Sequence, residues 1–131
     1  MKKTVLITVL ILFSFSIIYA QDGVKETSQQ AEMTFEYTEH NFGTMKQGSD
    51  VSFDFVYKNT GKAPLIITNV KKSCGCTTPE WSKEPLKKRK TNVIKVIYDS
   101  KRIAHFNKTI TVYSTAKNSP IVISIEGNIV K

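Results

Sequence analysis

Apolar and polar residues alternate along most of the chain from residue 33 onward. The pattern is clearest between Val51 and Lys58, where large apolar side chains occupy every second position. A period of two residues is typical of a β-strand with one buried face, and no stretch of this region sustains the 3.6-residue period of a helix. Strands are predicted over residues 33–37, 51–58, 65–70, 93–98, 108–113 and 121–125, the last extending toward Val130.

Polar residues, Gly and Pro separate the predicted strands. His40–Gly43 breaks the alternation, and Asn59–Lys62 predicts a turn in which Gly61 takes a positive φ. Residues 77–90 predict a long polar connection. Residues 65–70 are nearly all apolar, which predicts a strand that is covered on both faces or lies at the centre of a sheet.

Six or seven short strands in about 100 residues indicate an all-β, immunoglobulin-like β-sandwich of about seven strands. We place this domain at residues 33–131, and a closed barrel is the structural alternative. The widely spaced cysteine pair of antibody domains is missing, because the only cysteines are Cys74 and Cys76. Cohesion therefore rests on buried apolar side chains, each contributing about 1.5–3 kcal/mol.

The N-terminal segment, residues 1–20, resembles an export signal more than a folded segment. Two lysines precede an apolar run over residues 5–18, and a polar segment follows Ala20. We expect cleavage between Ala20 and Gln21, a periplasmic or secreted protein, and no stable membrane anchor afterwards. The alternative, a retained anchor, normally requires about 20 apolar residues. Residues 21–32 are polar and aperiodic, which predicts a short flexible leader.

The formal net charge of the whole chain is +8, from 19 Lys and Arg against 11 Asp and Glu. Residues 1–20 hold two lysines and no acidic residue, so their removal lowers the charge by two, to +6. For an exported protein this charge favours weak attraction to anionic envelope components, and nucleic acid is not an expected partner. A solvated basic face that aids solubility is the alternative. Lys87, Lys88, Arg89 and Lys90 form the densest basic run.

The segment Ser73–Pro79 holds both cysteines, one residue apart. In an oxidising compartment Cys74 and Cys76 are expected to pair, although so short a loop stabilises the fold by only about 1.5 kcal/mol. Strained, exposed bridges are easily reduced, which would suit thiol exchange. Gly75 would let the sulfurs converge, and Lys72 would favour the thiolate form.

Two other interpretations of this turn stay open. Two thiolates form a soft chelate suited to copper, but His40 and His105 are the only imidazole donors, and neither can be placed near the turn. The other interpretation is that the turn is an inert structural corner without chemistry. Trp81, which follows it, either binds a partner or covers one end of the core. No resident cofactor is predicted, and no strand-turn-helix context supports a nucleophile elsewhere.

Several segments together resemble the secreted family catalogued as domain of unknown function 1573. They are Asn41–Gly43, Phe55–Gly61, Ser73–Trp81, Tyr98–Ser100 and His105–Ser114, and the resemblance covers about residues 33–130. It implies an immunoglobulin-like fold, export by bacteria, frequently Bacteroidetes, and no assigned activity. One segment departs from the family, which usually has a Pro-Gly turn where this chain has Lys88–Thr91.

The sequence thus predicts an exported, non-enzymatic immunoglobulin-like module that binds another component of the cell envelope, a protein or a polymer. The alternative is thiol-redox or copper handling through Cys74-Gly75-Cys76. The first is favoured because a single turn carries the second, and because an immunoglobulin-like fold usually serves adhesion or assembly.

Overall fold

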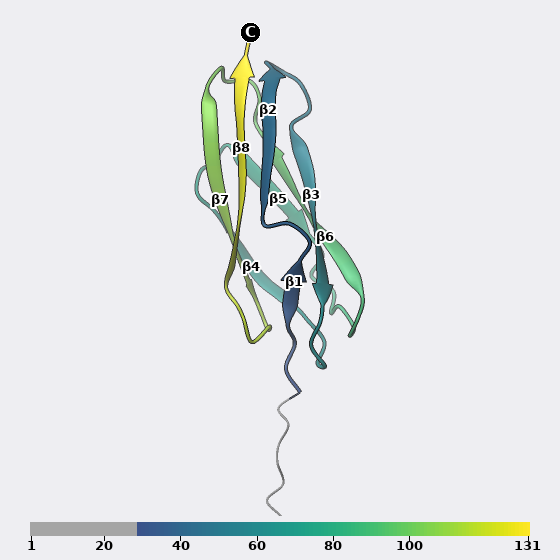
Figure 1. Ribbon diagram of the computed structural model, residues 1–131. Helices are drawn as coiled ribbons and strands as arrows, with labels where there is room; N and C mark the ends of the chain where they lie inside the picture. The colour runs from purple at the N-terminus through teal and green to yellow at the C-terminus, as the bar shows by residue number, and fades with distance from the viewer. Residues whose placement is uncertain (1–28) are drawn as a thin grey trace, which may run out of the picture.

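The computed structural model describes residues 29–131 and holds eight β-strands in two four-stranded sheets (Figure 1). The strands are β1 (Met33–Phe35), β2 (Glu39–Lys46), β3 (Ser52–Asn59), β4 (Ile67–Lys72), β5 (Thr77–Trp81), β6 (Thr91–Tyr98), β7 (His105–Ser114) and β8 (Ile121–Val130). One sheet has the order β1-β3-β6-β5 and the other β2-β8-β7-β4. No helix of the described part is long and apolar enough to cross a membrane. The predicted export signal and its cleavage point lie outside the described residues.

The predicted β-sandwich is confirmed, and its core follows from the alternation in the sequence. Phe55 of β3 pairs with Ile94 of β6, and Ile110 of β7 pairs with Ile123 of β8. All four side chains are fully buried between the sheets. Their chain neighbours point outward, because successive residues of a strand face opposite sides.

The prediction that His40–Gly43 interrupts the strands is wrong. These residues lie in β2, which runs parallel to β8. The pairing register shifts between Asn41 and Thr44, and Gly43 there has a φ of 66°. Such a bulge places two residues opposite one, so it hides the period of two in the sequence.

Two further strand predictions are wrong, and both concern edge strands. Part of the polar connection predicted over residues 77–90 is β5, which pairs only with β6. Residues 65–70 were predicted to form a strand that is covered on both faces or central; they contribute to a strand, β4, but it pairs only with β7 and its Thr68 and Asn69 are exposed. Its register shifts between Ile67 and Asn69, so only Ile67 and Val70 are buried in this strand.

The packed domain begins earlier than predicted. Ala31, which was assigned to the leader, is 2% exposed and pairs with Ala116. Gly61 packs so closely on this segment that an added Cβ would overlap the backbone of Gln30 and Glu32. Gly61 does not have the predicted positive φ. The chain needs glycine here because two backbone segments approach each other, not because the turn is left-handed.

Candidate functional site

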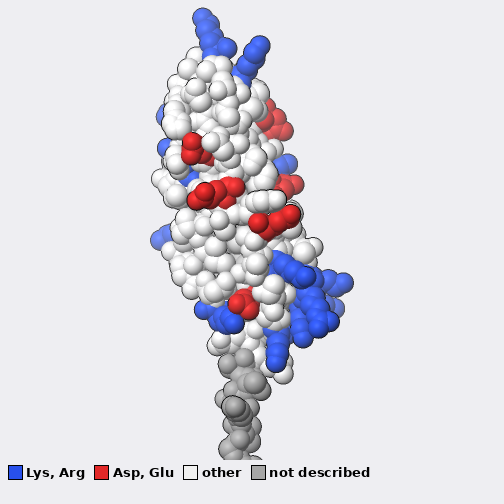
Figure 2. Space-filling model, in the orientation of Figure 1, with Lys and Arg blue, Asp and Glu red and all other residues white. Residues whose placement is uncertain are grey.

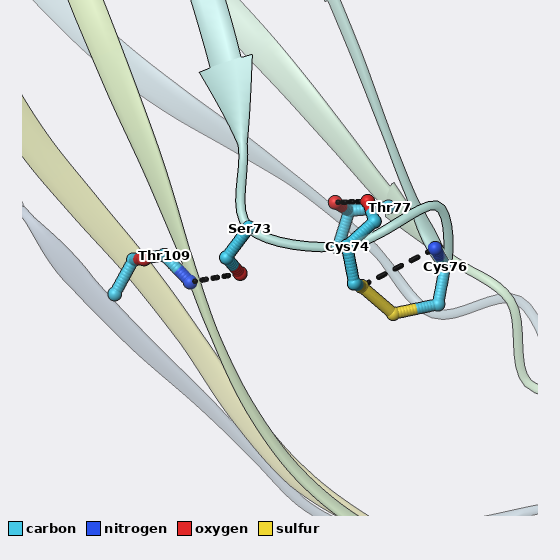
Figure 3. The surroundings of a disulfide bond; sticks show 5 residues. All are labelled: Ser73, Cys74, Cys76, Thr77 and Thr109. Atoms are coloured by element: carbon cyan, nitrogen blue, oxygen red, sulfur yellow. Dashed lines mark hydrogen bonds between the residues drawn. A yellow bond between two sulfur atoms is a disulfide. The ribbon is translucent and has the colours of Figure 1, made fainter.

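The cysteine turn, residues 73–76, connects β4 of one sheet to β5 of the other and is anchored to both; Figure 3 shows the anchor at Ser73. On one side Ser73 N–H donates to the Thr109 carbonyl at 3.0 Å, and Thr109 N–H donates to Ser73 Oγ at 3.1 Å. On the other side Asp99 N–H donates to the Cys76 carbonyl at 2.9 Å. The turn therefore holds its place through backbone hydrogen bonds at both ends.

Cys74 and Cys76 are joined by a disulfide, and both side chains are half-buried. Cys76 N–H donates to Cys74 Sγ at 3.2 Å, and the Thr77 hydroxyl donates to the Cys74 carbonyl at 3.4 Å. Gly75 is exposed, its φ is not positive, and a Cβ added there would meet nothing within 4 Å. The bridge therefore does not require glycine on steric grounds.

A cavity of about 320 Å³ opens beside the bridge and is lined by Cys74, Gly75, Cys76, Asp99, Arg102 and Lys108. The sequence pointed to Lys72 as the neighbouring cation, but Lys72 is exposed on β4 and does not line the cavity. The structure places Arg102 and Lys108 there instead. Lys108 lies between Phe106 and Ile110, both buried, at an inward position of β7. This lysine in the apolar register of a predicted strand was the signal that sequence reasoning missed.

Trp81 lies at the end of β5 and is half-buried. It packs against the core, as expected of a tryptophan that covers one end of it. Its Nε1 atom is buried and has no hydrogen-bond acceptor among the described residues. Trp81 is not among the residues that line the cysteine cavity.

Neither histidine lines the cavity beside the disulfide. His40 stacks on Phe53 with 3.7 Å between ring centroids, and desolvation by burial lowers its pKa below the usual value. His105 Nδ1 lies 3.1 Å from the Gly127 carbonyl oxygen. Within residues 29–131 no group of three or more His, Cys, Asp and Glu side chains is arranged to hold a metal. The two sulfurs, joined to each other, are not free as a soft chelate.

A second candidate site lies at the end of the molecule where the described chain begins (Figure 2). We call it the basic pole, and it consists of Lys58, Lys62, Lys87, Lys88, Arg89 and Lys90, all exposed. Asn59, which is fully buried, holds its loops together. Its Nδ2 donates to the carbonyls of Ala63 and Leu86, and its Oδ1 accepts from Gly61 N–H. Its backbone bonds to Arg89 and Lys90.

Lys87–Lys90 forms a tight turn in which Lys90 N–H donates to the Lys87 carbonyl at 3.1 Å. Arg89, at the third position, has a φ of 65°, the left-handed value that such a turn normally gives to glycine. The chain therefore makes a tight turn over Lys87–Lys90 without Pro or Gly, with an arginine in the left-handed position. This geometry displays four cations in succession.

An apolar groove of about 230 Å³ adjoins the basic pole on β1 and β3. Phe35, Val56 and Tyr57 line it together with Lys58, which belongs to the pole. The Phe35 and Tyr57 rings lie 5.8 Å apart, and burial raises the pKa of the Tyr57 phenol. Val93, which pairs with Val56 on the outer face of this sheet, is 38% exposed.

Comparison with known proteins agrees with the sequence resemblance. The model of the family described as "Protein of unknown function (DUF1573)" matches residues 33–129. No curated protein sequence matches the chain.

Three solved structures are similar in fold. A protein of unknown function from Porphyromonas gingivalis W83 has a TM-score of 0.68 at 14% identity, over 82% of this chain and 51% of its own. The ASH/PapD-like domain 7 of human CEP192 has a TM-score of 0.66 at 6% identity, over 79% and 88%. The YadV chaperone has a TM-score of 0.54 at 13% identity, over 76% and 53%. The chain thus spans about half the length of the first and third of these proteins, and identities this low show the fold alone.

Proposed function

Since the chain belongs to the DUF1573 family, whose description names no function, we propose a function from the geometry of its surface. The protein is an exported, non-enzymatic module that binds another protein of the cell envelope. The observation that carries this proposal is an apolar groove bordered by the basic pole. Its occupant is a segment of the partner with one large apolar side chain flanked by Asp or Glu.

The groove supplies the apolar part of this recognition. Phe35, Val56 and Tyr57 form the apolar part of its lining, beside Glu36, Lys58 and three threonines, and its volume of about 230 Å³ suits a single large side chain. Burial of such a side chain contributes about 1.5–3 kcal/mol. A sugar or phosphate polymer has no comparable group, so the groove favours a protein over a polymer as the partner.

The basic pole supplies the charge. Lys58 belongs to both the groove and the pole, so an acidic residue on that side of the anchor side chain would meet a lysine, whereas next to Glu36 it would be repelled. Complementary charges of this kind raise association rates and select partners more than they raise affinity. They also make binding weaken as salt concentration rises.

Three of the four edge strands, β1, β4 and β5, are poor templates for an added strand. Pro79 removes a backbone donor from β5, and the register of β4 shifts before its exposed Lys71 and Lys72. The side chain of Asn118 occupies both backbone groups of Met33 in β1, at 3.1 and 2.8 Å. Such features protect edge strands from pairing with another chain. A partner strand therefore has no long, regular edge to extend on these strands.

The fold comparison supports a protein partner in a general way. One protein of similar fold is described as a chaperone, YadV, and chaperones act on other proteins. Export is supported by the composition of residues 1–20. For the protein recovered from its native compartment, we expect an intact mass that begins at Gln21. A mass that includes residues 1–20 would contradict cleavage.

Site-specific photo-crosslinking in the intact envelope tests the binding proposal. A benzophenone amino acid at Val93, beside the groove, is expected to give a discrete protein adduct. The matched control is Val122, which is 53% exposed on β8 of the other sheet. The double substitution Lys87→Glu and Lys88→Glu is expected to reduce the Val93 adduct several-fold, while Lys71→Glu with Lys72→Glu leaves it unchanged.

Equal adducts at Val93 and Val122, or a Val93 adduct indifferent to the charge reversal at the basic pole, would contradict the proposal. A soft-metal function is not proposed for the oxidised protein, because Cys74 and Cys76 must be thiolates to bind copper and here they are joined.

A further inference from the structure

The cysteine cavity lies away from the groove and carries a different chemistry. We propose that the Cys74–Cys76 bridge is a thiol–disulfide exchange site for a dithiol substrate. In this site Lys108 and Arg102 stabilise the thiolates that attack and leave. The inference goes beyond the binding function and does not depend on the basic pole.

The bridge is open to a reacting thiol. Both sulfur-bearing residues line the cavity of about 320 Å³, and Gly75 between them is exposed. A half-buried bridge beside a cavity is easier for a thiol to reach than a structural disulfide sealed in a core, and accessible bridges are the more easily reduced ones.

Opening the bridge leaves the turn anchored. Ser73 stays bonded to Thr109 and Cys76 to Asp99 through groups that do not involve sulfur. The two cysteines are separated by only two positions in sequence, so their bond removes little entropy from the unfolded chain. The disulfide is therefore free to change its redox state without loss of the fold.

The charges around the cavity favour thiolates. Arg102 from the β6–β7 connection and Lys108 from β7 line it, against the single carboxylate of Asp99. Lys108 occupies an inward position of β7, where a strand normally places an apolar side chain. Its half-buried side chain is screened less by water and salt than the exposed lysines of β4. Cations beside a sulfur stabilise its charged form.

The hydrogen bonds assign the order of the step. A substrate thiolate attacks Cys76 Sγ, the S–S bond breaks, and its electron pair leaves on Cys74 Sγ, toward which Cys76 N–H points at 3.2 Å. The second substrate thiolate then attacks the substrate sulfur of the mixed disulfide and releases Cys76 as a thiolate. The substrate dithiol loses two electrons and two protons and becomes a disulfide, while Cys74 and Cys76 gain both and become thiols.

The test uses dithiothreitol as the dithiol and follows the folded protein by alkylation and mass spectrometry. Lys108→Gln is expected to slow reduction about three- to tenfold, because both the attacking and the leaving thiolate lose a neighbouring positive charge. Lys108→Arg keeps the charge and is expected to stay within about twofold of the unchanged protein. Lys72→Gln, an exposed lysine adjacent in sequence that does not line the cavity, is the matched control and is expected to have no effect.

Equal slowing by Lys72→Gln and Lys108→Gln, or no slowing by either, would overturn the role of Lys108. The order of the sulfurs has its own test in the single variants. Cys74 in Cys76→Ser is expected to react with iodoacetamide at pH 6 faster than Cys76 in Cys74→Ser, because the N–H of residue 76 still points at Cys74. Faster reaction of Cys76 would reverse the assignment. The double substitution Lys87→Glu and Lys88→Glu is expected to leave the reduction rate unchanged. That result would show that exchange at the cysteines does not depend on binding at the basic pole.

Discussion

Two corners of the sandwich are built in opposite ways. The cysteine turn contains conspicuous residues, two cysteines and a glycine, yet backbone hydrogen bonds at Ser73 and Cys76 hold it to both sheets. The Asn59 corner, residues 59–63 with 86–90, contains ordinary residues, yet the buried Asn59 and the close approach at Gly61 hold it together. The comparison teaches that chemically distinctive residues need not be the ones that stabilise a fold.

The largest expected effect is a difference in stability between the two corners when a glycine in each is replaced by alanine. Gly61→Ala would push a Cβ into the backbone of Gln30 and Glu32, so we expect a loss of about 3 kcal/mol in the free energy of unfolding. Gly75→Ala places its Cβ in open space and is expected to change stability by less than about 0.5 kcal/mol. Urea denaturation of both variants measures the difference. Equal losses in the free energy of unfolding for the two variants would contradict the proposed difference between the corners.

The side-chain anchors of the two corners give the next contrast. Asn59→Ala removes the three hydrogen bonds that a fully buried side chain makes to Gly61, Ala63 and Leu86, which is expected to cost about 2–3 kcal/mol. Ser73→Ala removes one exposed bond to Thr109 and is expected to cost about 0.5 kcal/mol. Thermal denaturation ranks them. A larger loss for Ser73 would reverse the assignment of which corner depends on a side chain.

Removal of the disulfide comes third in size. Replacing both Cys74 and Cys76 by Ser is expected to lower the free energy of unfolding by at most about 1.5 kcal/mol, because the closed loop is very short. The variant should keep the far-ultraviolet circular dichroism of a β-sandwich. A loss of several kcal/mol would make the bridge a structural element and would argue against exchange.

The smallest effect has the opposite sign. Arg89→Gly relieves the left-handed backbone of the basic pole and is expected to stabilise the protein by about 1 kcal/mol. Lys88→Gly, at a neighbour without a positive φ, is expected to destabilise it slightly, because glycine only adds freedom to the unfolded chain. The shift in melting temperature distinguishes them. Destabilisation by Arg89→Gly would mean that the arginine side chain contributes more than its backbone strain costs.

The sandwich was predictable because its central strands alternate cleanly. Residues 51–58 and 93–98 show the period of two that their burial confirms. The edge strands were missed for physical reasons. In β2 a bulge at Gly43 hides the period, and in β5 the half-exposed Pro79 and Trp81 make the segment look like a connection. Edge strands bury less and so leave weaker patterns in the sequence.

The candidate site was predictable only in part. The two cysteines marked the turn, and the basic run marked part of the pole. The cavity residues Arg102 and Lys108 come from the β6–β7 connection and from β7, far along the chain from the cysteines. Their proximity to the bridge depends on how the strands are ordered in the two sheets, which periodicity alone does not specify. Sequence neighbours such as Lys72 were therefore chosen instead.

The rate at which dithiothreitol reduces the bridge, in buffer and in urea, tests the central claim most directly. The claim is that the disulfide can be reduced while the protein stays folded. We predict that reduction of the folded protein is within about tenfold of the rate for the unfolded chain, because both cysteines line a surface cavity. Reduction slowed about a thousandfold or more in buffer would show that the bridge opens only through global unfolding, and would contradict the account.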